Sequence, residues 1–320
     1  MSGMRTIALE EHFWTAELAA APGTGPLAIW DQRIDDQLRD LGSGRLADMD
    51  ASGIDIQVIS HAPPAAQPLA EVGSVASARR ANDLLAEAVH THPGRLAGFA
   101  TLPTADPDAA ADELERATGE LGFVGALVHS TLGTNGAFLD EAGFEPLLDR
   151  FERLGVPLYL HPGPPPTALH EVLYRRLPPP VAARLATNCW GWHAEAGLHA
   201  LRMIATGVFD RHPGLKMIIG HCGEMLPFML ARIDQMLPLD MPPSAYFARN
   251  IWVTTSGMFT VPPVMCTVQV LGADRVLFSV DYPFGSNAAG RALLDALPVS
   301  LDDKAKIAGG NAGQLLGLSA

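Results

Sequence analysis

The chain has 320 residues, a hydrophobic fraction of 48% and a formal net charge of −13, with a pI near 5.2. This acidity argues against nucleic acid or an anionic membrane surface as a partner, because both require basic patches. No uncharged apolar run approaches the roughly 18 residues that a membrane-spanning helix needs, so the expected partner is a small molecule in solution.

The length fits one domain over residues 1–320, since α/β barrels occupy such lengths without dividing. The three cysteines form no C-x-x-C pair and no signal segment follows Met1, which favours a reducing cytoplasm without disulfides. The only lysines are Lys216, Lys304 and Lys306. None is placed to form a Schiff base or a carbamate between two metals, and no phosphate-binding glycine motif is present.

Short apolar runs alternate with longer helical patterns along the chain, which is typical of parallel βα units. Eight strands are predicted, at residues 7–9, 54–60, 96–100, 125–128, 157–160, 216–220, 251–255 and 276–280. Helical spacing of apolar residues is clearest at residues 77–92, 108–121 and 193–206. The pattern predicts an α/β protein with a distorted (β/α)8 (TIM) barrel.

Two irregular stretches, residues 20–32 and 162–180, interrupt this alternation. The second contains two runs of three prolines, and both are predicted to be loops. Both follow strands whose ends carry candidate ligands, so we expect them to cover the site, as long barrel loops often do. A third proline-rich segment, residues 237–244, is short.

Acidic and histidine side chains follow four of the predicted strands. They are Glu10, Glu11 and His12 after the first, His161 after the fifth, His221 with Glu224 after the sixth, and Asp281 after the last. In a (β/α)8 barrel these strand ends converge on one mouth. Carboxylate and imidazole are ligands for a divalent ion, which acts as a Lewis acid when one coordination position stays open. The pattern therefore predicts a metal-dependent enzyme.

The first cluster has a defined geometry on a strand. Glu10 and His12 are two apart and point to the same face, while Glu11 points away. Glu10 and His12 can thus hold a divalent ion between them, although an acidic helix cap also fits this pair. His161 fits either a ligand or a loop histidine bonded to the backbone.

The His-Cys-Gly-Glu segment leaves two roles open. His221 is either a fifth metal ligand or a base that a nearby carboxylate orients and keeps basic. Glu224 suits that orienting role, and it also suits a cap in the first turn of a helix. Asp281, at the mouth of the last strand, is expected to be functional.

A substrate pocket is expected around these residues. Arg232 lies eight residues after Glu224, about two turns along the same helix face, and can clamp a carboxylate; an arginine extending from an amphipathic helix fits equally well. Four further residues, His61, Trp190, Trp192 and Phe284, are predicted to line an aromatic pocket, although the two tryptophans and Phe284 also fit a core.

Taken together, the motifs resemble one family. They are ALEEHF at 8–13, LHP at 160–162, FDRHP at 209–213 leading to GHCGE at 220–224, and LFSVDYPF at 277–284. The chain resembles, almost end to end, the decarboxylase branch of the amidohydrolase superfamily. It is most similar to γ-resorcylate (2,6-dihydroxybenzoate) and 2,3-dihydroxybenzoate decarboxylases, and more distantly to aminocarboxymuconate semialdehyde decarboxylase.

The resemblance implies one Zn²⁺ or Mn²⁺ ion bound by Glu10, His12, His161 and Asp281. An aromatic carboxylate with an ortho hydroxyl group would chelate the ion, and Arg232 would contact its carboxylate. Asp281 would protonate the carbon that bears the carboxylate, and His221 with Glu224 would supply the proton. Protonation by Asp281 requires a neutral acid, which burial favours by raising its pKa and a bound cation opposes.

Departures from the family pattern bear on the substrate and on assembly. His61 stands where relatives usually carry asparagine, and Gly285 replaces a common acidic residue. The segment 237–244 is shorter than the arm that relatives use in subunit contacts. The resemblance still implies a homo-oligomer, a dimer or a tetramer.

Two other functions fit the same residues. One is hydrolysis of a lactone or amide, or hydration of an unsaturated diacid, by a mononuclear enzyme in which Asp281 is the base. The other is a metal-binding or scaffold protein without activity. Release of CO2 from an aryl acid distinguishes the decarboxylase from both.

Overall fold

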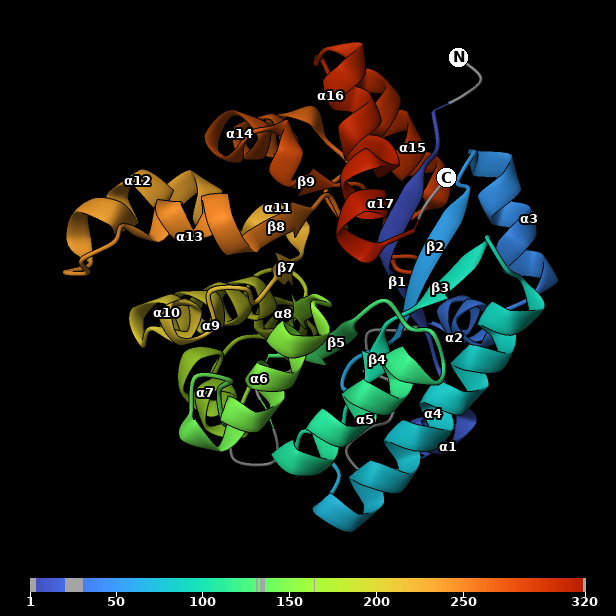
Figure 1. Cartoon of the computed structure of the whole chain (residues 1–320), viewed down its shortest axis with the longest axis horizontal. Helices are drawn as coiled ribbons and strands as arrows, with labels where there is room; N and C mark the ends of the chain where they lie inside the picture. Colours follow the sequence, from blue (N-terminus) through green and yellow to red (C-terminus); the bar gives the residue numbers. More distant parts are fainter. Residues whose placement is uncertain (1–3, 21–30, 131, 133–135, 164, 319–320) are drawn as a thin grey trace.

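The computed structural model describes residues 4–20, 31–130, 132, 136–163 and 165–318 (Figure 1). The described strands are β1 (Ile7–Phe13), β2 (Ile56–His61), β3 (Leu96–Gly98), β4 (Ala100–Thr101), β5 (Ala126–His129), β6 (Leu158–His161), β7 (Met217–Ile219), β8 (Ile251–Thr254) and β9 (Val276–Leu277). A strand overlaps each of the eight predicted ranges, but the bounds differ: β1 extends beyond residue 9, β9 ends at Leu277, and the third range, 96–100, is divided between β3 and β4.

The strands form two parallel sheets, ordered β1-β2-β3 and β4-β5-β6-β7-β8-β9. Only Phe99 separates β3 from β4, and its N–H donates to the carbonyl oxygen of Ile59 at 2.9 Å. At the other junction, Leu9 bridges Ser279 in parallel. These contacts close the strands into a distorted (β/α)8 barrel. Nearly every strand residue is buried, which explains the continuous apolar runs of the sequence.

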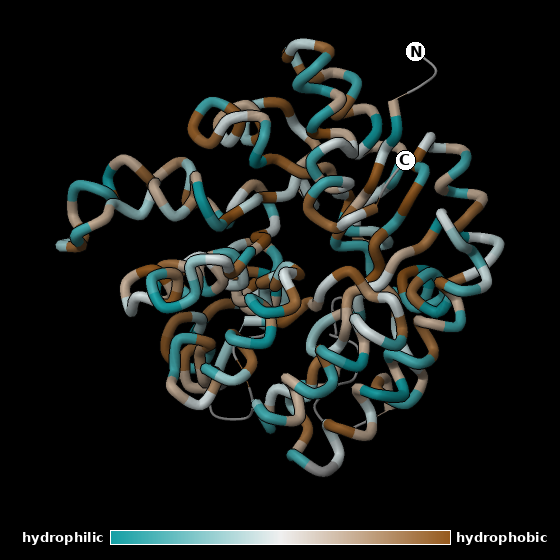
Figure 2. The backbone as a smooth tube through the Cα atoms, in the orientation of Figure 1, coloured by the Kyte–Doolittle hydropathy of each residue, from teal (hydrophilic) through white to brown (hydrophobic). Residues whose placement is uncertain are grey.

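The helices surround the strands. They are α1 (Ala16–Ala20), α2 (Gln32–Arg39), α3 (Ser43–Ser52), α4 (Glu71–Thr91), α5 (Pro107–Gly119), α6 (Glu145–Leu154), α7 (Thr167–Leu173), α8 (Pro179–Ala186), α9 (Gly191–Ala205), α10 (Val208–Arg211), α11 (His221–Glu224), α12 (Leu226–Met236), α13 (Pro243–Asn250), α14 (Val261–Leu271), α15 (Asn287–Ala296), α16 (Leu301–Ala305) and α17 (Asn311–Leu316). Hydrophobic and hydrophilic residues alternate along the outer helices (Figure 2), as expected for helices packed on a barrel. In the described residues, no helix has both the length and the apolarity needed to cross a membrane.

The prediction of a loop at 162–180 is wrong in part. Residues 167–173 form α7, and α8 begins at Pro179. Pro166 and Pro178 stand at the N-caps of these helices, and Pro179 is in the first turn of α8. Proline fits the start of a helix because its fixed φ suits the first turn and its missing N–H has no partner there. Of the other predicted loop, 20–32, residues 21–30 lie outside the described part of the chain.

Candidate metal centre and active site

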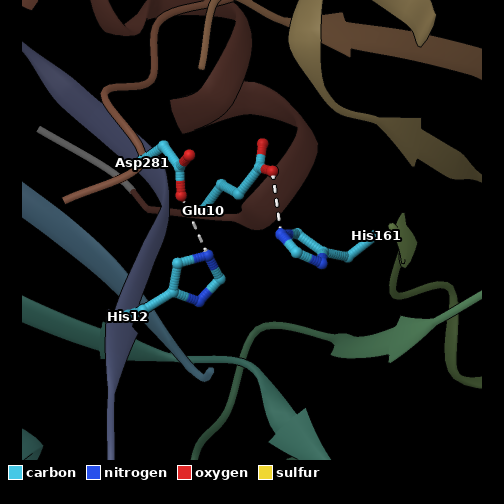
Figure 3. Close-up of side chains that lie close together, drawn as sticks. All are labelled: Glu10, His12, His161 and Asp281. Atoms are coloured by element: carbon cyan, nitrogen blue, oxygen red, sulfur yellow. Dashed lines mark ion pairs between the residues drawn. The ribbon is translucent and has the colours of Figure 1, made fainter. Parts of the chain in front are cut away.

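Four predicted ligands converge at the carboxyl ends of the barrel strands. Glu10 and His12 come from β1, His161 ends β6, and Asp281 follows β9. Their ligand atoms all lie within 4.8 Å of one another, and the side chains point toward a common centre (Figure 3). The imidazole Nε2 of His161 lies 3.2 Å from Glu10 Oε1, and that of His12 lies 3.3 Å from Asp281 Oδ1.

A β-bulge places Glu10 in this cluster. The first strand extends to Phe13, so its predicted end at residue 9 is wrong and Glu10 lies inside it. The pairing with β2 shifts between Ala8 and Glu11, and Glu10 has a φ of 64°. A bulge re-aims side chains near active sites. Glu10 and His12 therefore face the centre, as predicted, and Glu11 points elsewhere.

The geometry of the two histidines fits a metal ion. The Nδ1 of His12 lies 3.2 Å from Ser60 Oγ, and the Nδ1 of His161 lies 2.6 Å from the carbonyl oxygen of Pro162. With Nδ1 engaged in this way, each Nε2 is left to coordinate a cation. His12 Nε2 and Glu10 Oε1 are buried without a hydrogen-bond partner, which an ion between them would explain.

The second carboxylate oxygen of Glu10 is held from behind. It accepts hydrogen bonds from Tyr159 Oη and, at 3.1 Å, from Thr254 Oγ1. Burial raises the pKa of Glu10, but the charges of His221 and His161 outweigh burial and leave the pKa far below its ordinary value. Glu10 is therefore an ionised carboxylate with one oxygen directed at the centre.

Burial was expected to raise the pKa of Asp281, but the net shift of this pKa is downward. Burial does raise this pKa, but the adjacent imidazoles of His12 and His221 lower it by more, and the carboxylate form is favoured. An ionised Asp281 suits metal binding. To donate a proton, Asp281 must first receive one.

His221 is placed to provide that proton. Its Nε2 lies 3.8 Å from Asp281 Oδ2, and its Nδ1 lies 2.8 Å from Glu224 Oε1. Burial lowers the pKa of His221, but the carboxylates of Glu224 and Glu10 raise it well above its ordinary value. The ligand geometry groups His221 with Glu224 and His193, separately from the four-residue cluster. This favours the relay role over a fifth ligand.

The predicted position of Arg232 on the helix face of Glu224 is wrong. Glu224 and Arg232 were expected on one helix face, but Glu224 belongs to α11 and Arg232 to α12. Met225, with a φ of 65°, separates the two helices. The helical spacing from Glu224 to Arg232 does not continue across this break. Arg232 lies exposed in the second half of α12.

His61 is buried and is not among the described residues that line the cavity beside the cluster, so its predicted place in the pocket wall is not found. Its Nε2 accepts from the N–H of Thr15 at 3.2 Å, and its Nδ1 lies 2.9 Å from the carbonyl oxygen of Ala62. Burial lowers its pKa to about 4. His61 is thus a neutral side chain that connects β1 and β2.

A cavity of about 700 Å³ opens beside the four-residue cluster. Its apolar wall includes Ile34, Pro63, Trp190, Trp192, Met225, Met258, Phe259 and Phe284. Trp190 and Phe284 therefore lie where they were predicted, and the Phe284 ring is 5.6 Å from that of His12. Concave, largely apolar sites of this size, with a few converging polar groups, are typical of small-molecule binding.

Three polar residues of the site carried roles that the sequence interpretation did not assign. His193, on α9, contacts Glu224 Oε2 through Nδ1 at 2.6 Å. His129 ends β5 and lies 3.0 Å from His161, Nδ1 to Nδ1. The carboxylate of Glu11 accepts the backbone N–H groups of Val280 and Tyr282, which flank Asp281. His129 follows an apolar run, the signal that identified the other strand-end ligands.

Backbone strain is concentrated at the site. Eight described non-glycine residues have positive φ, and six of them belong to the site or its loops: Glu10, His221, Cys222, Glu224, Met225 and Asp281. Such conformations cost on the order of 1–3 kcal/mol each and persist where surrounding contacts over-determine them. The surrounding structure thus holds these side chains in functional positions.

Gly285→Ala is expected to destabilise the protein and to disturb the Asp281 loop. A Cβ at residue 285 would lie 2.2 Å from the carbonyl oxygen of Val280 and 2.6 Å from the Phe259 ring. Steric insertion of this kind costs roughly 1–3 kcal/mol. The thermal midpoint should fall, and Gly119→Ala, where a Cβ meets nothing within 4 Å, should not lower it. Equal midpoints for the two variants would contradict the packing argument.

Comparisons with known proteins agree with this geometry. An amidohydrolase family model matches residues 10–318. The γ-resorcylate decarboxylase of Rhodococcus jostii (strain RHA1) is 40% identical over 98% of each chain. The structure of 2,6-dihydroxybenzoate decarboxylase from Rhizobium superposes with a TM-score of 0.91 at 35% identity, covering 99% of this chain and 100% of that one.

A dihydroxybenzoic acid decarboxylase from Polaromonas sp. JS666, solved with manganese and the inhibitor 2-nitroresorcinol, gives a TM-score of 0.89 at 38% identity. The match covers 99% of this chain and 98% of that one. The resemblance inferred from the sequence motifs is confirmed. The chain belongs to the amidohydrolase superfamily, and the relatives described above are carboxy-lyases of that superfamily.

Proposed function

We propose that the protein catalyses metal-dependent, non-oxidative decarboxylation of an aromatic acid with a hydroxyl group ortho to the carboxylate. The observation that carries this proposal is the position of Asp281, which touches both the metal-binding cluster and His221. Asp281 can thus contact a substrate bound at the centre and can receive a proton from His221.

The four converging ligands, Glu10, His12, His161 and Asp281, are proposed to hold one divalent cation. When bound there, the cation would supply Lewis-acid polarisation of the carboxylate and phenolic oxygens of the substrate. The nitrogen and oxygen donor set suits Zn²⁺ and Mn²⁺ alike. The manganese in the Polaromonas relative favours Mn²⁺ for this chain.

Each decarboxylation consumes one proton. The C–C bond to the carboxylate breaks, its electron pair stays on the ring, and CO2 leaves as a C–H bond replaces it. Asp281 is proposed to deliver that proton to the ring carbon, and His221 to return a proton to Asp281. General acid catalysis of this kind contributes typically about 10²–10⁴-fold.

The cavity favours an anionic aromatic ligand. Trp190, Trp192 and Phe284 present ring surfaces to it. Arg33 and Arg184 also line it, and they bring positive charge to the entrance of a protein with a net charge of −13. Arg232 is exposed on α12 and is not among the described residues that line this cavity, so we propose that it contacts the substrate carboxylate from α12 of a second subunit.

The test is CO2 release from salicylate, 2,3- and 2,6-dihydroxybenzoate and 5-carboxyvanillate, with the metal content first determined by elemental analysis. We expect release from at least one acid, lost on chelation and regained with one metal. Metal-replete protein that releases no CO2 but hydrolyses a lactone or hydrates a diacid would show the alternative chemistry. Inactivity on every substrate would favour a scaffold.

Two further properties are proposed on general grounds. The acidic composition and the few cysteines fit a protein of the cytoplasm. Exposed apolar side chains on α12, among them Phe228 at 81% and Met236 at 60%, fit a homodimer or homotetramer. Sedimentation of the purified protein tests the assembly.

A further inference from the structure

We propose that His193 is the solvent-side end of a proton relay, His193–Glu224–His221, that returns a proton to Asp281 after each turnover. The inference rests on the proposed decarboxylation, because only a reaction that consumes a proton needs this supply. It adds a relay residue to a site in which Asp281, His221 and Glu224 already have proposed roles.

Hydrogen bonds connect His193 to His221 through Glu224, and the Nε2 of His221 lies 3.8 Å from Asp281 Oδ2. The Glu224 carboxylate joins two imidazoles, with Oε2 2.6 Å from His193 Nδ1 and Oε1 2.8 Å from His221 Nδ1. The two rings meet edge to face, with centroids 4.7 Å apart. The two nitrogen-to-oxygen distances, 2.6 Å and 2.8 Å, are those of short hydrogen bonds to an ionised group. Each oxygen of Glu224 thus serves a different histidine.

Of the three relay residues, His193 has the most exposed side chain and Glu224 the least, while Asp281 at the centre is 17% exposed. The Glu224 side chain is 0% exposed, that of His221 is 8% exposed and that of His193 is 12% exposed. The Nε2 of His193 lies 3.1 Å from the carbonyl oxygen of Asn188, an exposed residue before α9. His193 lines the cavity together with His221 and Glu224, and because its side chain is the most exposed of the three, it is the one that exchanges protons with water most readily.

The proton transfers balance. One proton passes from His193 Nδ1 to Glu224, one from Glu224 to His221 Nδ1, and one from His221 Nε2 to Asp281, which has given its own proton to the ring carbon. These transfers leave His221 in the Nδ1–H tautomer, and it returns to the Nε2–H tautomer before the next turnover. His193 then takes a proton from water. Each step breaks one N–H or O–H bond and forms another, and no electron is gained or lost. In net terms, one proton enters at His193 and one reaches the product.

His193 has an alternative role as a simple anchor for Glu224, and His193→Gln separates the two. Glutamine keeps an N–H donor for Glu224 but cannot take up and release a proton. For a relay, kcat should fall by about 10-fold or more while KM changes by less than about 2-fold, within the range of proton-transfer effects. Added imidazole buffer should raise kcat of the variant toward a plateau, and wild-type kcat should not respond.

The matched control is His212→Gln. His212 also lies between two carboxylates, Glu145 at 2.8 Å and Glu152 at 3.2 Å, but on the outside of the barrel. Its replacement should leave kcat and the imidazole response unchanged. Metal content and thermal midpoint, measured for each variant, show whether it is folded and loaded. If His193→Gln does not fold, His193→Asn takes its place under the same criteria.

The outcomes are distinct. A His193→Gln variant with wild-type kcat would overturn the relay and leave His193 as an anchor, as would a slow variant that imidazole does not accelerate. Wild-type protein that releases no CO2 would overturn the proposed function and the relay with it. If wild-type protein releases CO2 and the His193→Gln variant has the same kcat, the relay is overturned and the proposed decarboxylation is not.

Discussion

Asp281→Asn should lower kcat for CO2 release by about 10³-fold, within the range of general acid–base catalysis. Asparagine keeps the size of the side chain but cannot carry the proton to the ring carbon. It also removes one anionic ligand, whose Oδ1 lies 3.3 Å from His12 Nε2. The measurement is steady-state CO2 release, with rates referred to the bound metal determined by elemental analysis.

The metal measurement separates the two roles of Asp281. A variant that keeps its metal and loses turnover has lost the proton donor, whereas a variant that loses both has lost a ligand. The matched control is Asp295→Asn, since Asp295 is exposed on α15 and paired only with Arg291 in the described contacts. Its rate should equal that of wild type. An Asp281→Asn enzyme that retained most of its turnover would exclude Asp281 as the acid.

The barrel could be predicted from sequence because parallel strands buried on both faces appear as continuous apolar runs. The same runs located Glu10, His12, His161 and Asp281, since side chains at the carboxyl ends of such strands converge. His129 ends β5 in the same way. The same pattern could therefore have predicted that His129 lies beside His161.

Other features depend on contacts between distant segments. The left-handed residues 221–225 were expected to open a regular helix, because Cys222, Glu224 and Met225 carry no local signal for positive φ. Tertiary contacts hold them there, including a hydrogen bond that the backbone N–H of His221 donates to Ser256 Oγ. The false placement of Arg232 follows from this break. His193 begins a helix in sequence and meets Glu224 only in the folded chain.

Removal of the metal should abolish CO2 release and lower the thermal midpoint by roughly 5 °C. Binding to the folded state alone stabilises it by about 2.7 kcal/mol at 100 times Kd, and each kcal/mol shifts the midpoint of a large domain by roughly 2–4 °C. The structural reason is the pair of buried atoms without hydrogen bonds, Glu10 Oε1 and His12 Nε2. Both lose their partner when the cation leaves.

The measurement is a titration of chelated, dialysed protein with Mn²⁺ or Zn²⁺, followed by CO2 release and by thermal unfolding. Both readouts should recover together and saturate at one equivalent, because four ligand atoms within 4.8 Å of one another enclose a single ion. Glu10→Gln should shift the titration to higher metal concentration, since the amide carries no charge. Metal-free protein with full activity would contradict this centre, and saturation at two equivalents would place a second ion beside His193, His221 and Glu224.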